Sequence, residues 1–583
     1  MKKIVLVFCS IVLWSCNSTE SKKHESESQD AAFELYKNHF VDELWKTYPE
    51  WASAVGYHAY DSVITVNDES TRKKELLFLN SQLDSLKKYD ENKLSANNKT
   101  DLELIRNQLN SGIFNITEFN AHQWNPSIYN ISGSCAEILA SNVDKLDTRV
   151  KNIYLKLRNA RAYYEAAKAN IKNPTVEHTL LAIQQNEGAV STFENDYIDS
   201  VKKSGFSESE KTAMIARSKE AAVAMRDYVA WLKALKNDTP RSFRLGEALY
   251  KKKFVFDLQS SYDADQMYEK ASKRKAEIQQ EMATISKKLW SKYMDKQPMP
   301  DNDLEITKLV IAKLSEQHTS PDSFQVAIEN QFPQLLDFIK KKELIYIDPS
   351  KPLVVRKEPA YMQGVAGVSI SAPGPYDKNG NTYYNVGSMA SYTKEAAESY
   401  LREYNRYILQ ILNIHEAIPG HYTQLIYSNQ SPSLIKSLFG NNAMIEGWAV
   451  YTERMMMENG YDDSPEMWLM YYKWHLRSVC NTILDISVHT KEMKKEDALN
   501  FLVNEAFQQQ AEAENKWRRV SVTQVQLCCY FTGYSEIYDF REELKSKQKE
   551  AFKLKEFHEK FLSYGSAPVK NIRSLMLAEM QLN

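Results

Sequence analysis

Apolar side chains recur every three or four positions along most of the chain, which is the spacing of one face of an α-helix. In AAFELYKNHFVDELWKTY, for example, the apolar positions are Phe33, Tyr36, Phe40, Leu44 and Tyr48. The same spacing predicts helices over 73–89, 100–112, 149–169, 177–202, 207–237, 262–293, 322–342, 442–459, 465–491, 494–514 and 521–546. We find no fixed-period repeat, which argues against a solenoid.

The pattern changes between residues 345 and 390, where glycine, proline, tyrosine and β-branched residues gather. The stretch GVAGVSISAPGPYDKNGNTYYNVG predicts two short strands joined by a turn at DKNGN. Side chains alternate across a strand, so Tyr383 and Tyr384 are expected on opposite faces. The sequence therefore predicts a mainly α fold with a small β-element directly before a helix that ends at NIHEAI.

The first residues, MKKIVLVFCSIVLWSC, have a basic start and an apolar run from Ile4 to Trp14. This run is too short to span a membrane and is typical of a signal peptide, predicted here over residues 1–15. The ending LWSC resembles a bacterial lipobox with Cys16 as the lipidated residue. We therefore expect a membrane anchor in the cell envelope, on the periplasmic or the surface side. An ordinary cleaved signal or a short hydrophobic anchor is the alternative.

The polar stretch that follows predicts a disordered tether over residues 16–31. We then expect a helical region over 32–344 and a second region over 345–583, which holds the β-element and the candidate site. The two regions are expected as separate parts or as one domain with two lobes. No later segment has about 18 uninterrupted apolar residues, the length that a membrane span needs.

Composition excludes two kinds of site. The 583 residues include 74 basic and 76 acidic side chains, for a net charge of −2. This balance lacks the basic excess of nucleic-acid-binding proteins, so no nucleic-acid partner is expected. The cysteines contain no C-x-x-C pair, so a thiolate zinc site is not expected either.

The segment NIHEAIPGHYTQL opens like the zinc-peptidase signature H-E-x-x-H, with His415 followed by Glu416. The next histidine, His421, comes two residues later than the signature requires. On an unbroken helix, side chains six residues apart point about 120° apart and cannot bind one ion. Pro419 interrupts the helical hydrogen bonds, and Gly420 accepts almost any backbone angle. We therefore expect a turn at 418–420 that brings His421 back beside His415.

A third metal ligand is expected in MIEGWAVYTERM, where Glu446 lies among apolar residues. A buried carboxylate is costly unless it is paired or metal-bound. Glu453 lies two helical turns further along the same face and could orient a histidine ligand. The alternative is a solvated acidic face, which is the commoner origin of such spacing.

The segments HEAIPGHYTQ, EGWAVYTE, LRSVCNTILDISVH and QLCCYFTGY follow one another in this order. The series resembles the bacterial domain-of-unknown-function family 885, and YPEWASAVGYHAYD resembles the family's opening; together they cover about residues 33–580. The family is similar to zinc peptidases of the thimet oligopeptidase and carboxypeptidase Taq kind. The resemblance thus implies a large helical, zincin-like metallopeptidase fold, one zinc ion and a peptide substrate.

The resemblance also implies roles for single residues. His415, His421 and Glu446 match metal ligands, and Glu416 matches the general base that takes a proton from a metal-activated water. Tyr530 matches a hydrogen-bond donor to the oxyanion of the reaction, with a core tyrosine as the alternative.

Five further residues match the two later motifs. The resemblance implies that they contact the substrate or support the metal ligands: Arg477, Asp485, His489, Arg519 and Gln526. Arg477 is suited to binding a substrate carboxylate. Asp485 and His489 share a helix face, so they could hold one another, or His489 could touch substrate. A buried ion-pair network explains Arg477, Asp485 and His489 equally well. Where the family has Pro-Gly before the glutamine, this chain has Gln524-Val525, so the local turn is expected to differ.

The expected function is that of an exported lipoprotein with a zinc-dependent hydrolase site, most simply a metallopeptidase. A non-catalytic peptide- or ligand-binding lipoprotein is one alternative, and a hydrolase of a non-peptide amide, such as a cell-wall fragment, is another. In zinc peptidases of this kind a short edge strand pairs with the extended substrate. The segments GVSISAP and TYYNVG are the candidates for that strand.

Overall fold

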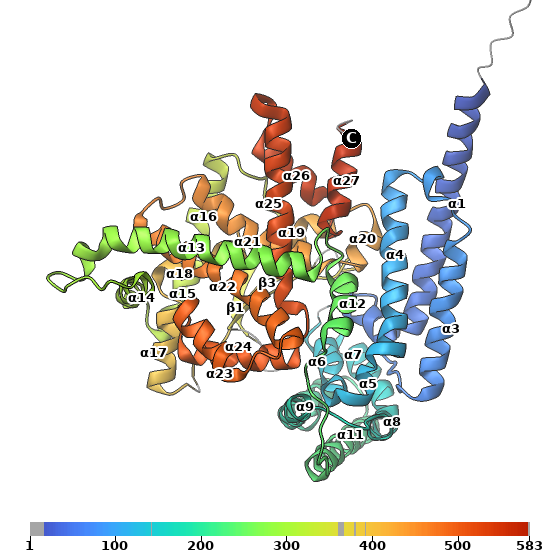
Figure 1. Cartoon of the computed structure of the whole chain (residues 1–583). Helices are drawn as coiled ribbons and strands as arrows, with labels where there is room; N and C mark the ends of the chain where they lie inside the picture. The colour runs from blue at the N-terminus through green and yellow to red at the C-terminus, as the bar shows by residue number, and fades with distance from the viewer. Residues whose placement is uncertain (1–16, 142, 359–366, 378–379, 391, 581–583) are drawn as a thin grey trace, which may run out of the picture.

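The computed structural model describes residues 17–141, 143–358, 367–377, 380–390 and 392–580. These residues form a mainly helical molecule with one small sheet, as the hydrophobic spacing predicts (Figure 1). The expected signal peptide and Cys16 lie outside the described residues. Among the helices described, none is both long and apolar enough to cross a membrane.

The first helices are α1 (Asn17–Thr47), α2 (Pro49–Ala54), α3 (Glu69–Leu86), α4 (Ala96–Phe114) and α5 (Ala121–Trp124), of which α1, α3 and α4 pack side by side (Figure 1). Phe33, Phe40 and Leu44 are buried, as their spacing predicts. The structure differs from the sequence prediction over 17–31, which is helical instead of a disordered tether. This stretch contains no glycine or proline and leads without a break into the amphipathic part of α1.

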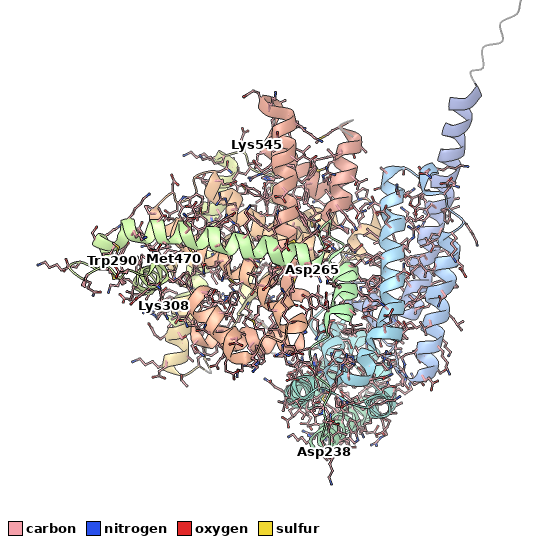
Figure 2. The ribbon with its side chains drawn as sticks, in the orientation of Figure 1. Asp238, Asp265, Trp290, Lys308, Met470 and Lys545 are labelled. Atoms are coloured by element: carbon pink, nitrogen blue, oxygen red, sulfur yellow. The ribbon has the colours of Figure 1, made fainter. Side chains whose placement is uncertain are left out.

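The next helices form a lobe around an apolar core of their own; they are α6 (Ser132–Ala140), α7 (Leu146–Lys156), α8 (Ala160–Asn170), α9 (Val176–Ala189), α10 (Tyr197–Lys203) and α11 (Glu208–Ala234). Asp238 lies at the outer end of this lobe (Figure 2). The predicted helices 149–169 and 177–202 are each divided, at a 3₁₀ turn over Leu157–Asn159 and a π turn over Thr192–Asp196.

The chain then returns to the larger part of the molecule through α12 (Glu247–Leu258), α13 (Ala264–Tyr293), α14 (Asp303–Leu314), α15 (Phe324–Glu329) and α16 (Phe332–Lys341). Helix α13 runs along the outside, from Asp265 near the centre to Trp290 at the far edge (Figure 2). It begins with a capping box in which Asp263 and Gln266 bind each other's backbone N–H groups. The predicted helix 322–342 is interrupted between α15 and α16, next to Pro333.

The sheet consists of β1 (Leu353–Lys357), β2 (Val368–Ser371) and β3 (Thr382–Val386), in the order β1-β3-β2. Strand β3 pairs in parallel with β1 and antiparallel with β2. Tyr384 is buried, whereas Tyr383 lies under the guanidinium of Arg356, so the two tyrosines face opposite sides as expected. The Tyr384 hydroxyl donates to Asn413 at 2.8 Å, which ties the sheet to the helix before the candidate site.

The remaining helices are α17 (Lys394–Glu403), α18 (Arg406–Glu416), α19 (His421–Asn429), α20 (Leu434–Leu438), α21 (Asn442–Glu458), α22 (Pro465–Thr490), α23 (Lys495–Asn500), α24 (Gln510–Val522), α25 (Cys529–Gln548), α26 (Leu554–Ser563) and α27 (Val569–Glu579). Two predicted helices, 494–514 and 521–546, have different bounds in the structure. A π turn over Phe501–Glu505 ends the first early, and the second begins only at Cys529, directly after a 3₁₀ turn over Gln526–Cys528.

Helices α21 and α25 cross with their backbones in direct contact, at Gly447 and Gly533. A Cβ atom on Gly533 would lie 1.6 Å from the carbonyl oxygen of Ala443, and one on Gly447 would lie 2.4 Å from the Cα of Gly533. Only glycine permits this approach. The crossing sets the position of Glu446, next to Gly447 on α21, relative to the first turn of α25.

Candidate metal centre

The chain turns sharply between His415, near the end of α18, and His421, the first residue of α19. The break lies at 417–420, where the sequence predicts it, and contains a cis peptide bond between Ile418 and Pro419. The Gly420 N–H donates to the Ile414 carbonyl at 2.9 Å. From α21, the indole N–H of Trp448 donates to the Pro419 carbonyl, also at 2.9 Å. The turn is therefore held by its own backbone and by the helix that carries Glu446.

Gly420 is required at this turn because the backbone folds back onto the end of α18. A Cβ atom at this position would lie 1.8 Å from the carbonyl oxygen of His415 and 2.4 Å from that of Ile414. The φ angle of Gly420 is −74°, so the need for glycine comes from the close approach and not from a left-handed backbone.

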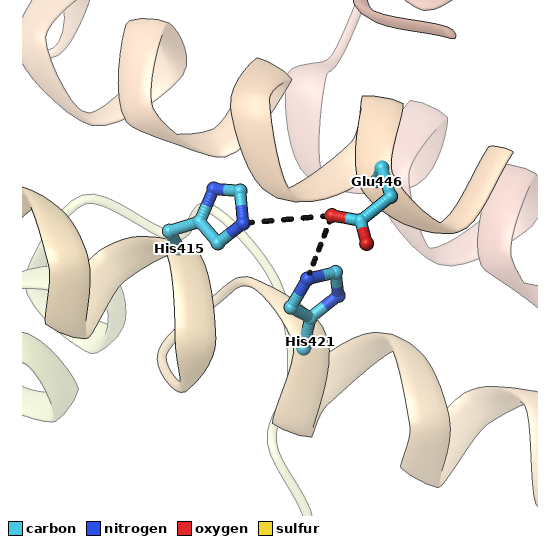
Figure 3. Close-up of side chains that lie close together, drawn as sticks. All are labelled: His415, His421 and Glu446. Carbon is cyan, nitrogen blue, oxygen red and sulfur yellow. Dashed lines mark ion pairs between the residues drawn. The ribbon is translucent and has the colours of Figure 1, made fainter. Parts of the chain in front are cut away.

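His415, His421 and Glu446 come together into one group that can hold a metal ion (Figure 3). The Nε2 atoms of His415 and His421 lie 3.7 Å and 3.3 Å from the same oxygen, Oε2 of Glu446. Ligands at 2.0–2.2 Å from a tetrahedral ion are about 3.3 Å apart, so these separations fit one ion. The His415 and His421 side chains are 8% and 11% exposed, and the Glu446 side chain is 23% exposed. The group is therefore most accessible to solvent at Glu446.

Glu453 fixes the orientation of His415. Its Oε1 lies 2.6 Å from Nδ1 of His415 and accepts the indole N–H of Trp474 at 3.0 Å. A carboxylate only accepts hydrogen bonds, so Nδ1 carries the proton and Nε2 is directed at the metal group. Burial disfavours a charged His415, but its bonds to Glu446 and Glu453 outweigh this and raise its pKa to about 10. Metal binding at this nitrogen must therefore release a proton.

Glu416 occupies the last position of α18, beside both histidines. Its carboxylate has no hydrogen-bond or ion-pair partner within the described ranges, and the residue is partly exposed. Burial is the main cause that raises its pKa, the charges of His415 and His421 oppose the rise, and Glu446 adds to it. A carboxyl group with a raised pKa and no fixed partner can both take up and deliver a proton.

Arg519, Gln526 and Tyr530 form a second cluster, from α24, from the turn after it and from the first turn of α25. Arg519 donates to Oε1 of Gln526 through Nε at 3.1 Å and through Nη2 at 2.7 Å. Nη2 also donates to the Tyr530 hydroxyl oxygen at 3.0 Å. Burial, followed by the negative charge of Glu446, raises the pKa of Tyr530 well above its usual value. Tyr530 therefore keeps its proton and lies in the field of the metal group.

Asp485 and His489, four residues apart on α22, do not bond to each other. Asp485 accepts the backbone N–H groups of Val525 and Leu527 at 3.0 and 3.2 Å. Nε2 of His489 lies 3.0 Å from the carbonyl oxygens of both Val520 and Thr523. The two side chains thus hold opposite ends of the turn between α24 and α25, and this turn places Arg519 and Tyr530.

Val525 is the residue at which the chain departs from the family's Pro-Gly pattern. It has a positive φ of 67°, the region that glycine favours and β-branched residues avoid. Its side chain is fully buried, and its N–H is bound by Asp485. The turn survives the departure because Asp485 and the surrounding core hold it.

Arg477 lies in a network of buried charges. Its Nη2 is 2.5 Å from Glu512, and its Nη1 is 3.7 Å from Glu403. Lys473 binds the other oxygen of Glu403 at 2.8 Å. The ion-pair network that the sequence left open is therefore present around Arg477.

The sequence did not identify Trp474, Glu403 or Glu512, because these residues belong to no motif. Trp474 does lie three residues before Arg477 on one helix, and this spacing is the only sequence signal that could have suggested it.

Two solved structures resemble this chain over nearly its whole length. A candidate lipoprotein of unknown function from Shewanella oneidensis is 51% identical, with a TM-score of 0.84 over 94% of this chain and 99% of that one. A candidate lipoprotein from Colwellia psychrerythraea shares the fold at 16% identity, with a TM-score of 0.76 over 96% and 100% of the two chains. No curated protein is significantly similar.

A match to one family covers most of the chain. It agrees with the order of the sequence motifs, with the candidate metal group and with the two similar structures. Residues 49–576 match the family described as bacterial protein of unknown function (DUF885), and the chain belongs to that family.

Proposed function

We propose that this protein is a zinc-dependent hydrolase that cleaves peptide bonds, and that it is held in the cell envelope by a lipid on Cys16. The observation that carries the proposal is the convergence of His415, His421 and Glu446 on one point. Two neutral imidazoles and one carboxylate, with a fourth position left for a ligand, are the donor set of catalytic zinc sites. The two relatives described as candidate lipoproteins support the anchor.

A zinc ion held by His415, His421 and Glu446 would supply Lewis acidity. Glu416 would remove the proton of the attacking water and pass it to the leaving nitrogen, for which its partner-free carboxylate is suited. Tyr530 would donate to the oxygen that becomes negative during the attack. Because Arg519 already donates to the phenolic oxygen, the proton of Tyr530 is free to point at that ligand.

Strand β2 is the better candidate for pairing with an extended peptide. The segment TYYNVG forms β3, which is central and hydrogen-bonded on both sides. The segment GVSISAP forms β2, an edge strand that pairs only with β3 among the described strands. Its position next to α18 favours a substrate that runs past Glu416.

The test uses protein that starts at residue 17, loaded with zinc and then freed of excess metal. We expect about one zinc per chain, strongly reduced binding in His415→Ala and Glu446→Ala, and hydrolysis of a peptide library by the wild type. Glu416→Gln should keep the zinc and lose hydrolysis, which separates an enzyme from a binding protein. A wild type without bound zinc under these conditions would refute the proposal. Zinc binding with cleavage of cell-wall amides only would change the substrate class.

A further inference from the structure

Arg519 is a largely enclosed cation that forms no ion pair with any carboxylate in the described part of the chain. Its hydrogen bonds go to two neutral groups, the Gln526 amide oxygen and the Tyr530 hydroxyl. These bonds use Nε and Nη2, and no hydrogen bond to Nη1 is found among the described residues. A guanidinium that is partly removed from water without an ion-pair partner is costly, and an anionic ligand in direct contact would offset this cost.

The neighbouring charges on α22 and α24 do not balance Arg519, because they are paired with one another. Lys473 binds Glu403 at 2.8 Å, and Arg477 binds Glu512 at 2.5 Å. Lys516 is buried and lies 3.8 Å from the same carboxylate, Glu512. Three cations thus share two carboxylates, so this network has no carboxylate left for Arg519. This distinguishes it from Arg477, which has its acidic partners already.

Arg519 also lies near the metal group and is accessible to a ligand bound there. Arg519, Gln526 and Tyr530 are each partly exposed, whereas the adjoining Leu527 and Cys528 are buried. The three exposed groups share hydrogen bonds, and Glu446 acts electrostatically on both Arg519 and Tyr530. A ligand that accepts from Tyr530 therefore has Arg519 beside it.

We propose that Arg519 binds the C-terminal carboxylate of the substrate, so that the enzyme is a carboxypeptidase. The inference rests on the proposed function. The Arg519 guanidinium lies 3.0 Å from the Tyr530 hydroxyl, and one residue of extended chain spans about 3.3–3.6 Å. A carboxylate at Arg519 therefore lies one or two residues beyond a carbonyl held by Tyr530. Gln526 is a positioning residue, since it orients the guanidinium through two of its N–H groups.

The experiment compares an N-acylated tripeptide that has a free C-terminus with the same peptide as its C-terminal amide. Wild-type kcat/KM should be about tenfold or more higher for the free acid. Arg519→Gln should lower kcat/KM for the acid by about 10- to 100-fold more than for the amide, because both peptides lose the hydrogen bond that orients Tyr530 but only the acid loses its partner for the carboxylate. Arg519→Lys should restore part of the difference. Arg518→Gln is the matched control, because Arg518 is an exposed neighbour on the same helix.

Binding separates this inference from the proposed function. Glu416→Gln protein, with or without zinc, is titrated with both peptides, and the acid should bind about tenfold more tightly than the amide. That difference should vanish when Arg519→Gln is added. Equal cleavage or equal binding of the two peptides by protein with intact Arg519 would overturn the inference. An equal fall in kcat/KM for the acid and the amide in Arg519→Gln would also overturn the inference, because Arg519 would then act only through Tyr530. A protein that binds the acid selectively but hydrolyses nothing would refute the proposed function alone.

Discussion

Replacing Gly420 by alanine tests whether the turn between the two histidines creates the metal group. The new Cβ would lie 1.8 Å from the His415 carbonyl oxygen, and real Cβ atoms do not approach within 3.0 Å of such an atom. The backbone at 420 and the end of α18 must therefore separate by about 1.2 Å. Both obstructing atoms belong to the backbone, so no side-chain rotation can relieve the clash.

A displacement of this size is large for a metal site, where ligand distances are held to within about 0.2 Å. His421 is the residue directly after Gly420, so it would move out of reach of an ion held by His415 and Glu446. We expect zinc affinity to fall by about 100-fold or more, beyond the loss seen when only a supporting residue is changed. The lost fit of the buried turn should also lower the free energy of unfolding by about 2–4 kcal/mol.

The assay is competition for zinc against a chromophoric chelator, with thermal unfolding of the metal-free protein measured in parallel. Gly188→Ala is the matched control, because a Cβ there meets nothing within 4 Å and lies inside α9. This control should bind zinc normally and gain about 0.5–1 kcal/mol of stability. Wild-type zinc affinity in folded Gly420→Ala would show that the turn is not what brings the two histidines together.

Three further changes test other parts of the structure. Glu453→Gln should weaken zinc binding by about 10- to 100-fold, because His415 loses its charged orienting partner; unchanged affinity would contradict this role. Asp485→Asn should lower the free energy of unfolding, measured with urea, by about 1–3 kcal/mol, since an amide N–H₂ would then face a backbone N–H. An unchanged free energy of unfolding would mean that Asp485 does not hold the turn. Burial lowers the pKa of His558 to about 3, so the unfolded state takes up the proton near pH 6.5 and the native state does not. His558 should therefore cost about 2 kcal/mol of stability as pH falls from 6.5 to 5, and His558→Gln should flatten the curve of Tm against pH; parallel curves would refute this assignment.

The candidate ligands could be predicted because their signals are local. Pro419 and Gly420 limit the backbone at the residues where they stand, so a break between His415 and His421 follows from the sequence. Glu446 was recognisable as a carboxylate in an apolar stretch. The roles of Asp485 and His489 could not be predicted in the same way. Helical spacing puts both on one face of α22, but the groups that they bind belong to the turn after α24.

Helix bounds show the same division. The stripe in α1 was correct because it depends on residues three and four apart. The breaks before α24 and α25 differ from the predictions, because helix ends respond to packing and capping partners elsewhere in the chain. The extension back to Asn17 has a local cause, since this stretch contains no glycine or proline.

By itself, the sequence determined the mainly helical character, the small β-element and the turn at 418–420, and together with the family resemblance it indicated the three residues of the candidate metal group. The first three follow from periodicity or from backbone limits within a few residues. Only the tertiary structure decided which charges are paired. It assigned Glu512 to Arg477, it showed that His415 is the histidine that Glu453 orients, and it gave Arg519 no carboxylate partner within the described residues. The physical reason is that electrostatic partners are set by distances between helices, and those distances depend on contacts such as the Gly447–Gly533 crossing.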